Sequence, residues 1–210
     1  PSHMSIINDS TYLIDGFYGS LFEIYDDTLG AILYRSIDWN TPLDYTPSTL
    51  IYDTTTHAVY SGGYTENNLL QASIYKYAFA ADSFSLLYND TVGSNIVNVI
   101  ASFNSLDIRG ENIFLSNSFN CTVDGGCSTI YGNPNSFNYF SYKSVKTDGT
   151  LNCKTILGGD ATYLVTKVLA TPDGGSLLFM QRHEVGHNLF RNNDLYYAKM
   201  DADCNIEYGY

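Results

Sequence analysis

Short apolar runs rich in strand-forming residues recur along the whole chain, and polar clusters of Gly, Asp and Asn separate them. The runs ASIYKYAF (72–79) and FNYFSYKSV (137–145) show the β-branched and aromatic bias of strands, whereas the polar clusters are typical of turns. No stretch sustains a helical period with caps at both ends. The pattern predicts antiparallel β-structure with almost no helix. Strands are expected to include Thr11–Asp15, Ile74–Phe79, Ile113–Ser116, Tyr139–Lys143, Leu177–Met180 and Leu195–Lys199.

Four segments repeat one order of features. An apolar strand, a polar turn and a second strand are followed by a variable loop, an aromatic-rich strand, an Asp-containing turn and a last strand. The turn aspartates Asp27, Asp82, Asp148 and Asp203 recur at intervals of about 55 to 66 residues, near the length of propeller-type repeats. The longest interval contains an insertion, Asn120–Ser136.

A unit of four short antiparallel strands, repeated at this length, is typical of β-propeller blades, which protect their edges by packing face to face. A β-sandwich would also be all-β, but it does not require such a repeat. We expect an all-β protein, a β-propeller of about four four-stranded antiparallel blades that is either complete or a fragment of a larger propeller. The expected domain covers residues 5–210, with units of approximately 5–44, 45–94, 95–160 and 161–210.

The last unit also carries a recognisable motif. Its TPDGG turn, SLLFM strand and NDLYYAKMDAD segment resemble kelch-like propeller repeats of secreted proteins from Bacteroidetes-type bacteria, with the pattern T-x-DGG … DLYxxKxD. The matching residues are Thr171, Asp173, Gly174, Gly175, Asp194, Leu195, Tyr196, Lys199 and Asp201. The third unit matches through 146–149, and the first two match only in strand order. The resemblance implies a kelch-like propeller and export, but it transfers no catalytic residue, because propeller function resides in grafted sites.

Charge and hydropathy limit the kinds of partner that the chain is expected to bind. The chain has 22 Asp and Glu against 10 Lys and Arg, which gives a formal net charge of −12. Such a surface repels phosphate backbones and argues against nucleic acid as a partner. No apolar run approaches the roughly 18 residues of a membrane span, so no membrane insertion is expected. Residues 1–4, PSHM, have the form of a tag remnant and are not expected to belong to the domain.

The four cysteines divide into two pairs. Cys121 and Cys127 flank the segment TVDGG, which predicts a local disulfide; a metal-binding pair is the alternative. A disulfide favours an oxidising compartment. Cys153 and Cys204 lie in last-strand positions of adjacent units, and whether they bridge depends on a Cα separation below roughly 7 Å that the sequence does not reveal.

The segment HEVGHNLFRNND (183–194) resembles the zinc-binding helix of metzincin peptidases. Zincins use two His four residues apart as ligands and the intervening Glu as general base, roles that would fall to His183, His187 and Glu184. This chain, however, has Phe190 where metzincins require Gly.

Asn193 also stands where the third His ligand belongs. In the repeat, Arg182–Asn193 fills the slot between the second and third strands, where surface loops vary in length. We therefore expect an exposed loop without zinc. The turn aspartates follow no EF-hand or nonapeptide calcium pattern.

These observations favour a non-enzymatic recognition or scaffold module of a secreted or cell-surface protein, without a cofactor. It is expected to bind a protein or glycan ligand through its loops, and Trp39 is a candidate ligand-binding residue. A glycan-binding lectin-type propeller is the alternative, and a zinc metallopeptidase using His183, Glu184 and His187 is a less favoured one. If the native protein has more blades, the four present here are a fragment whose exposed apolar blade faces should drive self-association.

Overall fold

The computed structural model describes residues 4–15, 22–35, 45–65, 71–79, 83–90, 97–99, 105–122, 136–184 and 194–209. These residues contain strands and turns but no helix, and their strands form four antiparallel sheets. The first sheet has the order β1 (Met4–Asn8), β2 (Thr11–Asp15), β3 (Phe22–Asp26), β4 (Ala31–Arg35). The second has the order β5 (Tyr45–Asp53), β6 (Ala58–Thr65), β7 (Gln71–Ala78), β8 (Ser83–Asn89).

The third sheet has an interrupted first strand. Its order is β10 (Leu106–Arg109), β11 (Asn112–Thr122), β12 (Ser136–Lys146), β13 (Leu151–Gly158), and β9 (Val97–Val99) pairs with β11 beyond β10. Because β9 and β10 pair with different parts of β11, they act together as one inner strand. The fourth sheet has the order β14 (Ala161–Ala170), β15 (Ser176–Glu184), β16 (Asp194–Met200), β17 (Ile206–Gly209).

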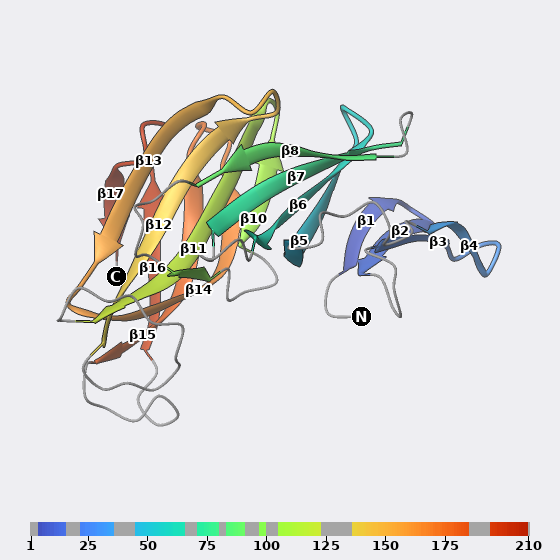
Figure 1. Cartoon of the computed structure of the whole chain (residues 1–210). Coiled ribbons are helices and arrows are strands. Elements are labelled where there is room, and N and C mark those ends of the chain that lie inside the picture. Colours follow the sequence, from blue (N-terminus) through green and yellow to red (C-terminus); the bar gives the residue numbers. More distant parts are fainter. Residues whose placement is uncertain are drawn as a thin grey trace.

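The fold class expected from the sequence is confirmed. The protein is all-β, and its four antiparallel sheets are the blades of a four-bladed β-propeller that follow one another in chain order (Figure 1). Five of the six expected strands lie inside observed strands, and the sixth, Ile74–Phe79, ends one residue early at Ala78. The short inner strand β10 was not expected, because its sequence LDIR carries two charges and little apolar pattern.

A register shift occurs between the third and fourth strands of every blade. It lies next to the connecting turn in three blades, at Ile24/Tyr25, Ser144/Val145 and Lys199/Met200, and further from the turn in the second blade, at Ile74/Tyr75. A bulge increases the local twist of a strand pair. Three blades therefore share the position of this irregularity as well as their strand order, although their sequences share only a pattern.

Three apolar clusters join successive blades. The cluster between the first and second blades contains Leu13, Leu50, Val59 and Tyr77. The cluster between the second and third contains Ala58, Tyr60, Ala72, Ile74, Leu106, Ile113, Leu115 and Val145. The third cluster lies between the third and fourth blades and includes Phe114, Phe140, Tyr142, Leu178, Met180 and Met200. These clusters bury the facing sides of successive blades, as the apolar strands of the sequence require.

Three hairpin turns share one backbone geometry, at 146–150, 171–175 and 201–205. In each, the first residue's N–H donates to the carbonyl of the fifth, and the fourth residue's N–H donates to the carbonyl of the first. This is the three-residue hairpin loop whose last loop residue has a positive φ. Gly149 and Gly174 take that position with φ of 92° and 88°.

The motif residues of the fourth blade hold two of these turns together. Lys199 Nζ lies 2.8 Å from Asp173 Oδ2 and donates to the carbonyl oxygen of Met200. The Lys199 hydrogen bond holds the pKa of Asp173 below its usual range. A Cβ at Gly175 would overlap that same Met200 oxygen, which explains the second glycine of the motif. The T-x-DGG and K-x-D residues therefore stabilise the blade.

Candidate binding face

Strand order decides which connections share an end of the propeller. In a blade of four consecutive antiparallel strands, the turns between strands one and two and between three and four lie at one end. The connections between strands two and three, and those leading to the next blade, lie at the opposite end. Figure 1 shows this in the third and fourth blades: β11 and β15 both run away from the tight turns and end on the opposite side.

Four segments leave this second end between the second and third strands, one from each blade: 16–21, 66–70, 123–135 and 185–193. The segments 36–44, 90–96 and 159–160 join successive blades at the same end. We call this end the binding face. Its connections differ in length from blade to blade, whereas the opposite end consists largely of tight turns held by Asp and Gly.

Three candidate positions from the sequence belong to these connecting segments. Trp39 belongs to 36–44, and Cys127 and His187 belong to 123–135 and 185–193; all three lie outside the described residues. The backbone of Cys121 belongs to β11, two residues before 123–135. The expected Cys121–Cys127 disulfide and a ligand-binding role for Trp39 therefore stay predictions.

The zinc-peptidase motif begins in a strand. His183 pairs with Thr162 and Glu184 pairs with Ala161 in the ladder between β14 and β15. A zincin needs a helix from its first His onward, and strand residues advance by about 3.3 Å each instead of winding into a turn. The first two residues of the motif therefore lack the backbone that the metal-binding arrangement requires.

The expected start of the exposed loop at Arg182 was wrong, because β15 continues to Glu184. The long strand β14 offers pairing partners up to Ala161, and Arg182 is anchored beside it. The Arg182 guanidinium lies 3.2 Å from Asp160 Oδ2, and its Nε donates to the Tyr163 hydroxyl over 3.3 Å. Pairing with a neighbouring strand therefore extends a strand whose own sequence is polar.

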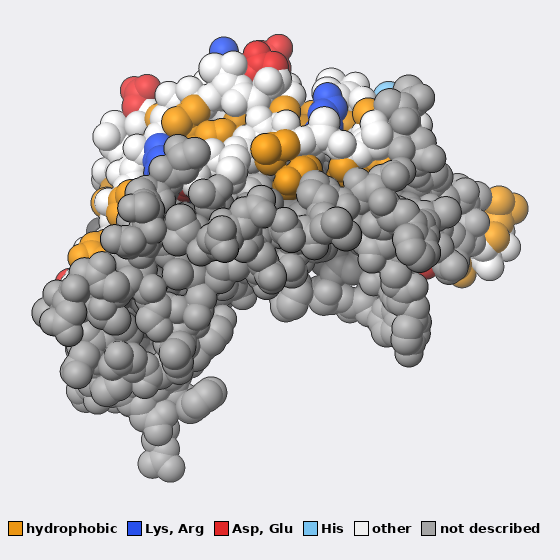
Figure 2. Space-filling model, viewed as in Figure 1, with side chains coloured by type: hydrophobic (Ala, Val, Ile, Leu, Met, Phe, Trp, Pro, Cys, Tyr) orange, Lys and Arg blue, Asp and Glu red, His pale blue; other side chains and the backbone are white. Residues whose placement is uncertain are grey.

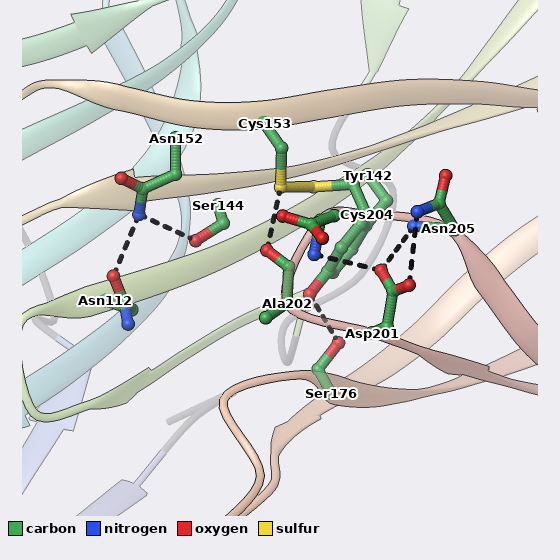
Figure 3. The surroundings of a disulfide bond; sticks show 11 residues. Asn112, Tyr142, Ser144, Asn152, Cys153, Ser176, Asp201, Ala202, Cys204 and Asn205 are labelled. Atoms are coloured by element: carbon green, nitrogen blue, oxygen red, sulfur yellow. Dashed lines mark hydrogen bonds between the residues drawn. A yellow bond between two sulfur atoms is a disulfide. The ribbon is translucent and has the colours of Figure 1, made fainter.

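The third and fourth blades are joined covalently. Cys153 of β13 and Cys204 form a disulfide with a Cα–Cα distance of 5.8 Å, across a sequence separation of 51 residues (Figure 3). Cys204 lies in the turn before β17, not in the last strand as its sequence position suggested. It has a φ of 64° at the loop position that glycine takes in the turns at Gly149 and Gly174.

Polar groups beside the disulfide order the same interface (Figure 3). Asp201 Oδ1 accepts hydrogen bonds from the backbone amides of Asp203 and Asn205, which fixes the turn that carries Cys204. The hydroxyl of Ser176 donates to the Tyr142 hydroxyl over 2.9 Å. Burial raises the pKa of Tyr142 to about 12.

A buried polar group, which we call the lysine cluster, lies between the second and third blades. It consists of Asp90 after β8, Asn117 on β11, Ser141 and Lys143 on β12, and Lys154 on β13. Lys143 Nζ donates to Asp90 Oδ2 over 2.5 Å and to Asn117 Oδ1 over 2.8 Å. Lys154 Nζ donates to Asp90 Oδ1 over 2.5 Å, and the Ser141 hydroxyl donates to Asn117 Oδ1 over 2.6 Å.

Burial dominates the electrostatics of the lysine cluster. The Lys143 side chain is 0 % exposed, and this burial lowers the pKa of its ammonium group to about 8 although Asp90 opposes the shift. Burial alone would raise the pKa of Asp90, but the ammonium groups of Lys143 and Lys154 hold it below its usual range. The sequence contains one signal for this cluster, because Lys143 is a charged residue within an aromatic strand. Strand propensity alone does not reveal which residues it contacts.

The exposed surface carries scattered apolar side chains. Figure 2 shows them as small groups among polar atoms on the described part of one face. The large apolar residues with the greatest exposure are Ile6, Leu29, Leu86, Leu151, Ile156, Leu195, Ile206 and Tyr208. Several lie on the outermost strands β8, β13 and β17.

No model of a known protein family matches the chain, and no curated protein matches it. Within the described residues, no group of three or more His, Cys, Asp or Glu side chains is arranged to hold a metal ion. The same part of the chain includes no helix that is long and apolar enough to cross a membrane.

Proposed function

We propose that the protein is a non-enzymatic recognition or scaffold module that binds a protein or glycan ligand through its binding face. The observation that carries this proposal is topological: seven connections that differ in length and sequence leave the same end of a repeated scaffold. Variable loops held by a rigid framework are the usual position of binding residues, and fold alone does not specify the ligand.

The rigidity of the scaffold supports the same proposal. The Cys153–Cys204 disulfide joins the third blade to the fourth, and the lysine cluster joins the third blade to the second through buried charge-assisted hydrogen bonds. Both lie in blade interfaces. Such a framework fixes the positions from which the connections leave, and pre-organisation of this kind lowers the entropic cost of binding.

We also propose that the blades are of the kelch-like type and that the protein is secreted or displayed on a cell surface. Support comes from the motif residues Asp173, Gly175 and Lys199, which each have a structural role in the fourth blade. A disulfide between blades further favours an oxidising compartment, because cytosolic reductants keep most thiols reduced.

Self-association through blade faces is a further part of the proposal. Leu195 and Tyr208 of the fourth blade are 73 % and 47 % exposed, on the face directed away from the third blade. Light scattering over a wide concentration range should show a growing species. A strictly monomeric protein would count against this part and leave the recognition function standing.

The test compares binding to a glycan array and to a panel of immobilised cell-surface proteins. Trp39→Ala on the binding face should weaken the binding seen with the wild type. The matched control is Leu29→Ala in the β3–β4 turn, at the opposite end, where the side chain is 69 % exposed; it should bind like the wild type. Glycan binding alone would favour the lectin-type alternative.

Two outcomes would overturn the proposal. One is an absence of binding to both panels by the folded wild type. The other is cleavage of a panel ligand or of casein by the wild type, abolished by Glu184→Ala and by a chelator. The second outcome would favour the zinc metallopeptidase and would require the motif to leave the β15 strand geometry.

A further inference from the structure

Three members of the lysine cluster bring together an amine, a carboxamide and a carboxyl group in a dry interface. Lys143, Asn117 and Asp90 are 0 %, 1 % and 1 % exposed. The amine nitrogen of Lys143 lies 2.8 Å from Asn117 Oδ1 and 2.5 Å from Asp90 Oδ2. These are a nucleophile, an electrophile and a proton carrier for forming an amide bond between side chains.

We propose that Lys143 and Asn117 form an isopeptide bond that joins β11 to β12, with Asp90 as the proton carrier. The bond is a self-modification of the scaffold and does not depend on the proposed recognition function. Amide formation from an amine and a carboxamide releases ammonia, so no oxidant, metal or cofactor takes part.

Strand register creates the approach of the two reacting side chains. Asn117 pairs with Ser141, and Leu115 pairs with Lys143. Asn117 and Lys143 are therefore diagonal neighbours on the same face of the third blade, which is the face directed at the second blade. Diagonal neighbours in an antiparallel pair are within reach of long side chains. The pairing holds this geometry permanently, which gives the reaction a high effective concentration.

The reaction balances with the groups present. The Lys143 ammonium group gives a proton to the Asp90 carboxylate, and the lone pair of the neutral amine attacks Cγ of Asn117, so that an Nζ–Cγ bond forms. Asp90 passes the proton to Nδ2, and the Cγ–Nδ2 bond breaks as the carbonyl re-forms. The proton left on Nζ returns to Asp90 and leaves with ammonia as ammonium. The starting ammonium group and carboxamide have become a secondary amide and an ammonium ion.

The surroundings favour the attack of the amine on Asn117. Burial makes the neutral amine accessible, since it lowers the pKa of Lys143 to about 8. The hydroxyl of Ser141 donates to Asn117 Oδ1 over 2.6 Å, and this is the oxygen on which negative charge develops during the attack. Exclusion of water protects the tetrahedral species from competing hydrolysis.

Lys143 is favoured over the second lysine. Lys154 Nζ contacts the carboxylate of Asp90, which is a poor electrophile while ionised, and the Lys154 side chain keeps 22 % of its exposure. Its positive charge holds Asp90 in place beside Lys143. Lys154 is therefore a positioning residue for the proton carrier.

Intact-mass spectrometry of the reduced, denatured protein tests the proposal. The wild type should weigh about 17 Da less than its sequence requires, because one ammonia is lost. Protease digestion should recover the segments containing Lys143 and Asn117 as one cross-linked pair. Lys143→Arg should restore the full mass, whereas the matched control Lys146→Arg, an exposed position on the same strand, should keep the deficit.

Two further variants keep the test decisive if Lys143→Arg does not fold. Asn117→Asp should still form the bond, now with loss of water and a deficit of about 18 Da. Asp90→Asn should fold, as judged by circular dichroism, but lose most of the cross-link. A folded wild type that keeps its full sequence mass after long incubation at mildly alkaline pH would overturn the proposal. The cluster would then be an ion-pair network only.

Discussion

The interface between the third and fourth blades is built more strongly than the interface between the first and second. Among the described residues, the former packs Phe140, Tyr142 and Met180 into one cluster with residues of both blades, and the latter packs Leu13, Leu50, Val59 and Tyr77. The former is also crossed by the Cys153–Cys204 disulfide and by a hydrogen bond of 2.7 Å from the Ala170 amide to Asp107 Oδ2. The first two blades contain no cysteine, so no covalent link restrains their separation, whereas opening of the cross-linked blades is restricted. Copies of one repeated unit can therefore differ in local stability, with the C-terminal half as the firmer part.

Removing the disulfide should have the largest effect. Cys153→Ser combined with Cys204→Ser should lower the free energy of unfolding by about 4 kcal/mol, because the cross-link restricts the unfolded chain over 51 residues. Urea denaturation of this variant and the oxidised wild type measures the difference. An unchanged midpoint would show that the third and fourth blades hold together without the covalent link.

The next largest effect is expected from two matched substitutions of buried leucines. Leu178 and Leu13 are 0 % and 1 % exposed, and each lies in one of the two compared interfaces. Leu178→Ala should lower the free energy of global unfolding by about 3 kcal/mol, within the usual range for a buried leucine. Leu13→Ala should affect mainly the first blade and speed hydrogen exchange in β1–β4. Equal shifts of the global transition would remove the proposed difference between the interfaces.

The repeat and most strands were predictable because they depend on local pattern. Leu195–Lys199, for example, lies within β16, since an apolar run between polar turns has few other ways to bury its side chains. Strand ends were less predictable. The end of β15 depends on pairing with Ala161 and Thr162 of a neighbouring strand and not on the composition of QRHE itself.

The interface chemistry could not be predicted, because it joins residues far apart in the chain. The Cys153–Cys204 pair and the Lys143–Asp90 pair each connect two blades, so their geometry follows from blade packing and not from spacing. The candidate residues Trp39 and His187 lie on the binding-face segments by topology, and the roles expected for them stay predictions.

The interface between the third and fourth blades should also make stability depend on pH, because it contains the buried Tyr142. Burial raises the pKa of Tyr142 to about 12, while a tyrosine in the unfolded chain ionises near 10. A raised folded pKa stabilises the protein fully below pH 10, and this contribution is lost as pH rises from about 10 to 12. Tyr142→Phe should therefore flatten the fall in stability over that window. It should also cost about 1 kcal/mol at neutral pH, since the hydrogen bond with Ser176 is lost. Urea melts at several alkaline pH values measure both effects; a parallel fall in wild type and variant would exclude Tyr142 as the cause.

The smallest expected effect concerns the turn that carries Cys204. Its φ of 64° is a conformation that side chains with a Cβ adopt at a cost, and the equivalent turns have Gly149 and Gly174. Without the disulfide, nothing in the turn requires a cysteine. Cys153→Ser with Cys204→Gly should therefore be about 1 kcal/mol more stable than Cys153→Ser with Cys204→Ser. Urea midpoints of the two variants give the difference directly, with no disulfide in either protein.

If the glycine variant is the less stable of the two, its greater entropy in the unfolded chain outweighs the relief of strain. In that case the cysteine at this position would cost the native turn little.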